Sequence, residues 1–141
     1  MTMRRVAVVT GCASGVGLGV TRHLAAAGHR VAVLDVAGDS AEGAAAELRA
    51  SGRDSLGVKV DVSNRAGVDE ALGKVRSEFG PIGIMVTSAA ITGFAKFVEI
   101  TSEEWDRMIA VDLTGTFHCL QAVLPDMIAA GWGRIVTISS S

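Results

Sequence analysis

Three glycines near the start of the chain are spaced so that they could hold a phosphate. Gly11, Gly15 and Gly17 follow a short apolar, β-branched run and precede an apolar helical pattern. Backbone amides at such a helix start carry a partial positive charge, and glycine lets a pyrophosphate approach closely. The spacing differs from the common fingerprint G-x-G-x-x-G, so by itself it is also typical of an ordinary tight turn. We expect phosphate contacts from Gly11, Ser14, Gly15, Val16 and Gly17.

An acidic residue at the end of the second apolar run makes the glycine turn more specific. Asp35 closes the run 30–35, where a carboxylate would meet the ribose hydroxyls of an adenosine. Such a carboxylate accepts hydrogen bonds from both hydroxyls and repels a 2′-phosphate, so it favours NAD over NADP. Ser14 supports this preference, because the turn offers no Arg or Lys to that phosphate. The alternative is a solvated carboxylate at a strand end.

A second acidic residue closes the third apolar run. Asp61 could accept a hydrogen bond from the amino group of adenine, while the backbone amide of Val62 holds the ring. The alternative is a negative charge placed at the start of the following helix, where it is also stabilising. Features at three strand ends on one side of a sheet are more specific together than any one of them.

The elements that must position these residues alternate between strand and helix. Short apolar runs predict five strands, at 6–10, 30–35, 56–60, 82–86 and 134–138. Helical patterns lie between them, at 15–27, after Asp39, at 64–79, from Thr101 and at 113–130. Near-continuous apolar strands separated by helices predict an α/β fold with a doubly wound parallel sheet, in the strand order 3-2-1-4-5. In such sheets the ligand lies at the carboxyl ends of the strands.

Two helix starts carry capping signals. Asp39 precedes Glu42, and Thr101 precedes Glu104, at the spacing of a capping box. We expect each pair to satisfy backbone amides in the first turn of its helix.

Composition restricts the classes of function. The 141 residues suffice for one domain, and the net charge of -2 gives no reason to expect a nucleic-acid or acidic-membrane partner. No apolar run is long enough to cross a bilayer. Cys12 and Cys119 have no CxxC partner, so we expect reduced thiols and a cytoplasmic protein. The three histidines lack metal-ligand spacing; His29 is expected at the surface, and His118 is expected to pack within an apolar helix.

Several motifs in order resemble the short-chain dehydrogenase/reductase family. They are Thr10-Gly11-xxx-Gly15-x-Gly17, Asp35, Asp61-Val62, Val-Asp-Leu-Thr-Gly at 111–115, and Gly-Arg-Ile-Val-Thr-Ile-Ser-Ser at 133–140. The resemblance covers the whole chain. It implies a Rossmann-like fold and hydride transfer between a nicotinamide cofactor and a small alcohol or carbonyl substrate. It also implies a homo-oligomer, a dimer or tetramer, built in part by the helix at 113–130.

The resemblance also assigns residues near the reacting groups. Ser140 matches the family's catalytic serine, which hydrogen-bonds the substrate oxygen, and Asp112 stands where the family has a catalytic asparagine. Ala89 and Ala90 belong to a segment beside the cofactor, which reads Thr-Ser-Ala-Ala at 87–90 where the family has Asn-Asn-Ala-Gly.

The main departure concerns the catalytic tyrosine and lysine of the family. Their Tyr-xxx-Lys motif would lie beyond Ser140, and the chain contains no tyrosine. General acid–base catalysis without that pair is not supported by the residues that remain. We therefore expect one NAD(P)-binding domain over residues 1–141, incomplete at its C-terminus and inactive alone. The alternatives are a non-catalytic dinucleotide-binding module and, less favoured, a methyltransferase.

Overall fold

A single parallel sheet forms the centre of the computed structural model, which describes residues 3–12 and 15–139. Its strands are β1 (Val6–Thr10), β2 (Arg30–Asp35), β3 (Ser55–Lys59), β4 (Ile84–Thr87) and β5 (Arg134–Thr137). They pair in the order β3-β2-β1-β4-β5, which confirms the expected order. The order reverses between β1 and β4, so the carboxyl ends of these two strands flank the switch point of the sheet.

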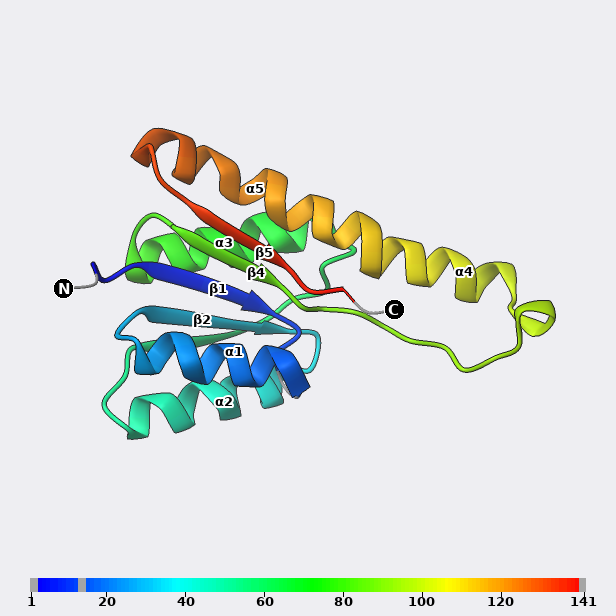
Figure 1. Cartoon of the computed structure of the whole chain (residues 1–141), viewed down its shortest axis with the longest axis horizontal. Helices are drawn as coiled ribbons and strands as arrows, with labels where there is room; N and C mark the ends of the chain where they lie inside the picture. Colours follow the sequence, from blue (N-terminus) through cyan, green and yellow to red (C-terminus); the bar gives the residue numbers. More distant parts are fainter. Residues whose placement is uncertain (1–2, 13–14, 140–141) are drawn as a thin grey trace.

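Helices cover both faces of the sheet. They are α1 (Gly15–Ala26), α2 (Gly38–Ala50), α3 (Arg65–Phe79), α4 (Ser102–Met108) and α5 (Gly115–Ala130), with a short 3-10 turn, η1 (Phe97–Glu99). Figure 1 shows α1 and α2 on one face of the sheet and α3 and α5 on the other. Within the described residues, no helix is both long and apolar enough to cross a membrane.

Alternation along the strands builds two separate cores. Val8, Ala32 and Met85 belong to the core under α3 and α5, whereas their neighbours Val9 and Val33 belong to the core under α1 and α2. The second core also contains Ala41 and Ala45 from α2, both with no exposed surface. Small side chains let α2 approach the sheet closely, as the alanine-rich stripe of that helix predicts.

Of the two predicted capping boxes, one is confirmed and one is wrong. The Thr101 side chain accepts from the Glu104 amide, and the Glu104 carboxylate accepts from the Thr101 amide at 2.8 Å. At α2, however, the helix already begins at Gly38, so Asp39 lies in its first turn and the cap residue Ala37 makes no side-chain cap hydrogen bond. Glu42 instead pairs with Arg49 on its own helix.

The fourth strand begins later than its apolar run. Ile82 is buried, but its amide donates to the Asp126 carboxylate of α5 at 2.9 Å instead of joining the sheet. Arg76 of α3 binds the same carboxylate, with Nε to Oδ2 at 2.9 Å. His29 is also buried, against the expectation of a surface position, because its Nδ1 accepts from the Arg5 amide at 3.1 Å.

Two helices expected as separate elements form one continuous run. α4 continues through a π-helical turn, η2 (Ile109–Thr114), directly into α5. π-turns are rare and occur often at functional sites. The run therefore carries residues 102–130 along one edge of the molecule, from the loop after β4 to the end of the sheet (Figure 1).

The last strand and the outer side of α5 are open to solvent. Every residue of β5 is exposed, and α5 exposes Phe117, Leu124 and Ile128, the last by 75%. An exposed strand edge beside large apolar side chains is typical of a surface that another element or another chain covers.

Candidate functional site

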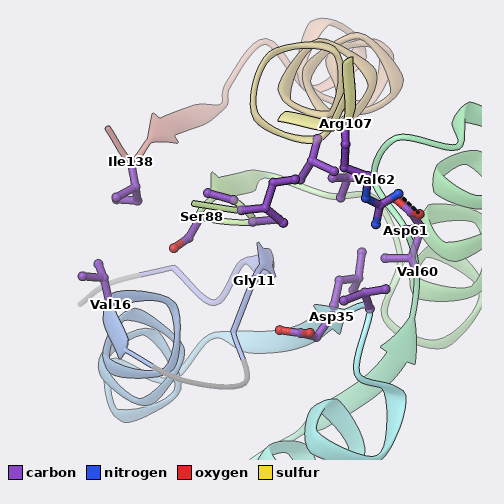
Figure 2. A pocket seen from close by; sticks show the side chains of 15 residues that line it. Gly11, Val16, Asp35, Val60, Asp61, Val62, Ser88, Arg107 and Ile138 are labelled. Atoms are coloured by element: carbon purple, nitrogen blue, oxygen red, sulfur yellow. Dashed lines mark ion pairs between the residues drawn. The ribbon is translucent and has the colours of Figure 1, made fainter. Parts of the chain in front are cut away.

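A cavity of about 450 Å³ opens at the carboxyl ends of the strands, where the ligand of such a sheet is expected. Figure 2 shows the side chains around it. The cavity brings together residues from the ends of β1, β2, β3 and β4, the segment after β5 and the long helical run. They include Gly11, Val16, Asp35, Asp61, Val62, Ala89 and Ala90 from the predicted set, together with Ser88, Arg107, Val111 and Ile138.

The glycine turn is shaped by positive φ angles and by two close approaches of the backbone. Gly11 and Gly15 adopt positive φ angles of 64° and 59°, which other residues rarely adopt. A Cβ on Gly11 would lie 2.5 Å from the backbone of Ala89, and a Cβ on Gly17 would collide with the carbonyl oxygen of Gly11. Glycine at these positions therefore lets β1, α1 and the segment after β4 meet at one point. Ser14, predicted to take part in this turn, lies outside the described residues.

Buried Thr10 ties the glycine turn to the segment after β4. Its Oγ1 accepts hydrogen bonds from the amides of Ser88 and Ala89, both at 3.2 Å. On the other side, the Gly11 amide donates to the Leu34 carbonyl at 2.9 Å, which links the turn to β2. The floor of the cavity is thus one hydrogen-bonded unit across three strands.

Asp35 stands at the end of β2 and lines the cavity. Its Oδ1 accepts from the Ala37 amide at 2.9 Å, which turns the chain away from the strand. The carboxylate is half-buried and lies in the same cavity as the glycine turn (Figure 2). A ligand extending along the cavity from the turn would reach a negative charge here.

Asp61 is held on both of its oxygens. Oδ1 accepts from the Ser63 hydroxyl at 2.6 Å and from the Ser63 amide at 3.0 Å. Oδ2 lies 3.6 Å from Nη1 of Arg107 on α4. The Ser63 hydroxyl in particular, with help from Arg107, lowers the pKa of Asp61 below its ordinary value of 3.8, so the carboxylate is charged at neutral pH. Val62 is buried beside it.

Asp112 lies in the π-turn, where its side chain and its carbonyl have different partners. Oδ1 accepts from the Ile91 amide at 2.8 Å, and the carbonyl accepts from the Thr116 hydroxyl at 3.0 Å. Asp112 therefore anchors the segment that leaves the cavity after Ala90. Ser140, predicted to be its catalytic companion, lies outside the described residues, two positions after cavity-lining Ile138.

Arg107 is the charged cavity residue that sequence reasoning missed. Its partner Asp61 is distant in sequence, so no local pattern marks it; only the position of Arg107 one helical turn before Val111 places it on this side of the run. Among the described residues, no group of three or more His, Cys, Asp or Glu side chains could hold a metal ion.

Comparison with known proteins identifies the family of the chain. The family model for short chain dehydrogenases matches residues 5–141. The chain belongs to the short-chain dehydrogenase family. Because this is a family of oxidoreductases, the match argues against the methyltransferase alternative.

Individual short-chain dehydrogenases are similar over nearly the whole chain. D-threitol dehydrogenase from Mycolicibacterium smegmatis is 39% identical over 136 residues, which are 96% of this chain and 52% of that protein. 3-Oxoacyl-[acyl-carrier-protein] reductase FabG from Staphylococcus epidermidis is 34% identical, over 98% of this chain and 57% of that protein. The crystal structure of a 3-ketoacyl-ACP reductase from Sinorhizobium meliloti 1021 superimposes with a TM-score of 0.93 at 34% identity, over 96% of this chain and 53% of that one. The chain thus spans about half the length of these relatives.

Proposed function

We propose that the protein is an NAD-dependent oxidoreductase that interconverts an alcohol and a ketone or aldehyde by hydride transfer. The observation that carries the cofactor assignment is Asp35, a carboxylate in the same cavity as the glycine turn. A carboxylate at the end of β2 suits the two free ribose hydroxyls of NAD and opposes the 2′-phosphate of NADP.

The residues that line the cavity support a dinucleotide as its ligand. Gly11 lets the turn pack directly against the backbone of Ala89 in the cavity wall, and the start of a helix after such a turn favours an anion. Asp35 and Asp61 stand at separate strand ends, as expected for groups that receive hydrogen bonds from a ribose and from an adenine amino group. Within the described lining the one basic residue is Arg107, and it faces Asp61.

Each residue then has a defined task. The turn at Gly11, Ser14, Gly15, Val16 and Gly17 binds the diphosphate, and Asp35 binds the ribose of the adenosine. Asp61 and Val62 bind adenine, while Ala89 and Ala90 leave room along the opposite wall. NAD, when bound, supplies the carbon that accepts or returns the hydride.

The reacting half of the site rests on the family. Ser140 would hydrogen-bond the substrate oxygen and Asp112 would hold the segment after Ala90 in place, while the acid–base step requires the family's Tyr-xxx-Lys pair, which residues 1–141 do not contain. The substrate would be a small alcohol or carbonyl compound. The exposed side of α5 (Phe117, Leu124, Ile128) supports assembly as a dimer or tetramer, and the buried free thiols Cys12 and Cys119 suit the reducing cytoplasm.

Titration of the intact protein with NAD and NADP tests the cofactor assignment. Wild type should bind NAD more tightly, and Asp35→Ala should weaken NAD binding by about tenfold or more, because charge-assisted hydrogen bonds are lost. Asp35→Ala should also reduce the ratio of NAD affinity to NADP affinity, whereas Asp35→Glu should keep the preference for NAD. Lys59 stands in register with Asp35 on the neighbouring strand, so it is the nearby cation that could bind the 2′-phosphate of NADP. Lys59→Met is the control that tests for this. A wild-type preference for NADP that Lys59→Met abolishes would refute the role given to Asp35.

Turnover separates the enzyme from a binding module. The intact protein, supplied with NAD and a panel of small secondary alcohols, should form NADH for at least one of them. Tight NAD binding without turnover of any alcohol, or of any ketone with NADH, would favour the non-catalytic module.

A further inference from the structure

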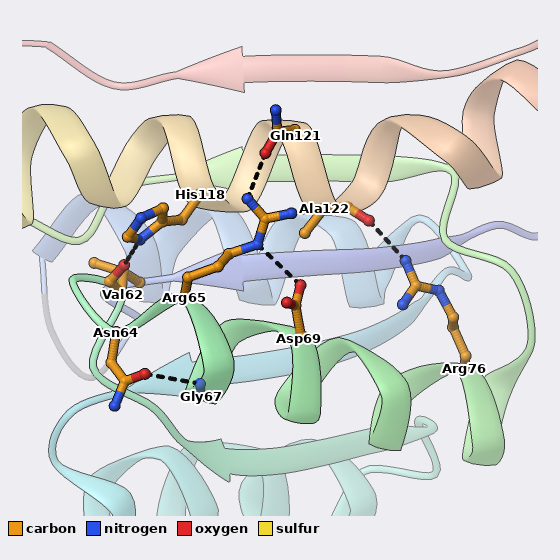
Figure 3. A network of polar contacts seen from close by, with 9 residues as sticks. All are labelled: Val62, Asn64, Arg65, Gly67, Asp69, Arg76, His118, Gln121 and Ala122. Carbon is orange, nitrogen blue, oxygen red and sulfur yellow. Dashed lines mark hydrogen bonds and ion pairs between the residues drawn. The ribbon is translucent and has the colours of Figure 1, made fainter.

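The corner formed by Asp61 and Val62 is held by one helical run at three points. Arg107 in α4 faces the Asp61 carboxylate at 3.6 Å. Gly115, at the start of α5, touches Val62 so closely that a Cβ there would lie 2.5 Å from Val62 Cγ2. One turn later, His118 Nδ1 lies 2.8 Å from the Val62 carbonyl oxygen, as Figure 3 shows.

From these contacts we infer that His118 is a positioning residue for adenine recognition: it holds the Val62 backbone in place from behind the cavity. The inference rests on the proposed function, because it assumes that the Asp61–Val62 corner meets adenine. His118 itself does not line the cavity.

The hydrogen bond fixes the state of the imidazole. A carbonyl oxygen can only accept, so Nδ1 of His118 must carry the proton and donate. The donor is present both in the neutral Nδ1–H tautomer and in the imidazolium ion. The hydrogen bond therefore does not require His118 to be charged.

The packing around the bond makes it directional. Val62 is 5% exposed, and Gly115 sets how near α5 approaches its side chain. The peptide group between Val62 and Ser63 is held at both of its polar atoms, because the Ser63 amide donates to Asp61 Oδ1 at 3.0 Å and the Val62 carbonyl binds His118. The His118 bond thus holds the carbonyl end of this peptide group, opposite the end held by Asp61, and so supports the Val62 residue whose own amide is proposed to meet adenine. Recognition groups held from behind in this way keep the precise geometry that binding requires.

Paired substitutions separate the donor from the bulk of the side chain. His118→Asn places an amide N–H near the position of Nδ1, whereas His118→Gln places the same group one bond farther out, and His118→Leu removes the donor. In the intact protein we would measure the affinity for ADP-ribose, KM and kcat with NAD, and the melting temperature of the unliganded protein.

We expect His118→Leu and His118→Gln to weaken the binding of ADP-ribose and to raise KM for NAD, each by about tenfold, with kcat little changed. The reason is that the Val62 carbonyl loses its hydrogen-bond partner. His118→Asn should stay close to wild type. If His118→Leu does not fold, the Asn and Gln pair still decides the question.

Two results would overturn the inference. Loss of melting temperature with unchanged ADP-ribose affinity would make His118 merely structural, and equal losses in the Asn and Gln variants would exclude the donor as the cause. The proposed function fails differently: the wild-type protein itself would bind neither NAD nor ADP-ribose, and the inference would fall with it.

Discussion

Arg107 and Asp61 form an ion pair in the wall of the cavity, with Nη1 and Oδ2 3.6 Å apart, while Oδ1 of Asp61 accepts from Ser63. The two oxygens therefore differ in role. Ser63 fixes the carboxylate from its own loop, and Arg107 approaches from a helix that also reaches Val62 through His118. The oxygen facing Arg107 is the one that a ligand would share.

Ser63→Ala should raise the pKa of Asp61 toward its ordinary value of 3.8, because the hydroxyl donor is the largest cause of the lowering. Asp61 stabilises the fold above pH 3.8, and that contribution is lost as the pH falls through the lower pKa of the folded state. The acid midpoint of unfolding should thus move upward in Ser63→Ala. A carboxyl NMR titration measures the pKa directly, with exposed Ser77→Ala as the control. An unchanged Asp61 pKa would contradict this account.

Thr10→Val should destabilise the protein by about 1–3 kcal/mol, since the Ala89 amide loses its acceptor and the Ser88 amide keeps only the Thr10 carbonyl. Thr87→Val is a matched control on the neighbouring strand. The buried Thr87 hydroxyl has no hydrogen-bond partner among the described residues, so its removal should be neutral or stabilising. Urea unfolding of both variants makes the comparison, and equal losses would be inconsistent with it.

Cys12 and Cys119 should resist alkylation in the native protein. Burial raises the pKa of Cys12 to about 12, with a further contribution from the Asp35 charge, and burial raises that of Cys119 to about 11. Because the thiolate is the reactive form, iodoacetamide at neutral pH should label neither thiol until urea unfolds the chain. Intact-mass measurement counts the labels. Rapid labelling of Cys12 in native conditions would show that the glycine turn opens.

Asp112→Asn should keep the fold stability within about 0.5 kcal/mol, because an amide oxygen can accept from the Ile91 amide as the carboxylate does. Asp112→Leu, of similar size, should lose about 1 kcal/mol and release the segment after Ala90. Turnover of the intact protein should follow the same order. Activity retained in Asp112→Leu would remove the anchoring role from this residue.

The strand order and the cavity followed from local patterns. Apolar runs alternating with helices, and side chains at strand ends, needed no knowledge of distant contacts. Asn64 and Thr101 begin their helices because each caps its own first turn, at Gly67 and Glu104. Such information lies within a few neighbouring residues, so the sequence contains it.

The errors arose where a distant residue decided the outcome. Ile82 looks like a strand residue, but Asp126 of α5 takes its amide. Arg107 and His118 look like ordinary helix residues, and only the fold brings them to Asp61 and Val62. Asp39 shows another limit: the helix cap is Ala37, two residues before the position that the capping pattern indicates, so a good cap residue is left inside the first turn.

The close approach of Gly17 to Gly11, and of Gly11 to Ala89, also has a genetic consequence. Every missense change of a single base in a glycine codon introduces a residue with a Cβ. At positions 11 and 17, every amino-acid substitution that a single base change can produce therefore places a Cβ against the backbone. Gly43 is an exposed helix position with open space around it. A change to alanine there should leave the stability of the fold unchanged or raise it. Selection on this gene should therefore accept only synonymous changes at codons 11 and 17, whereas codon 43 should also accept amino-acid substitutions.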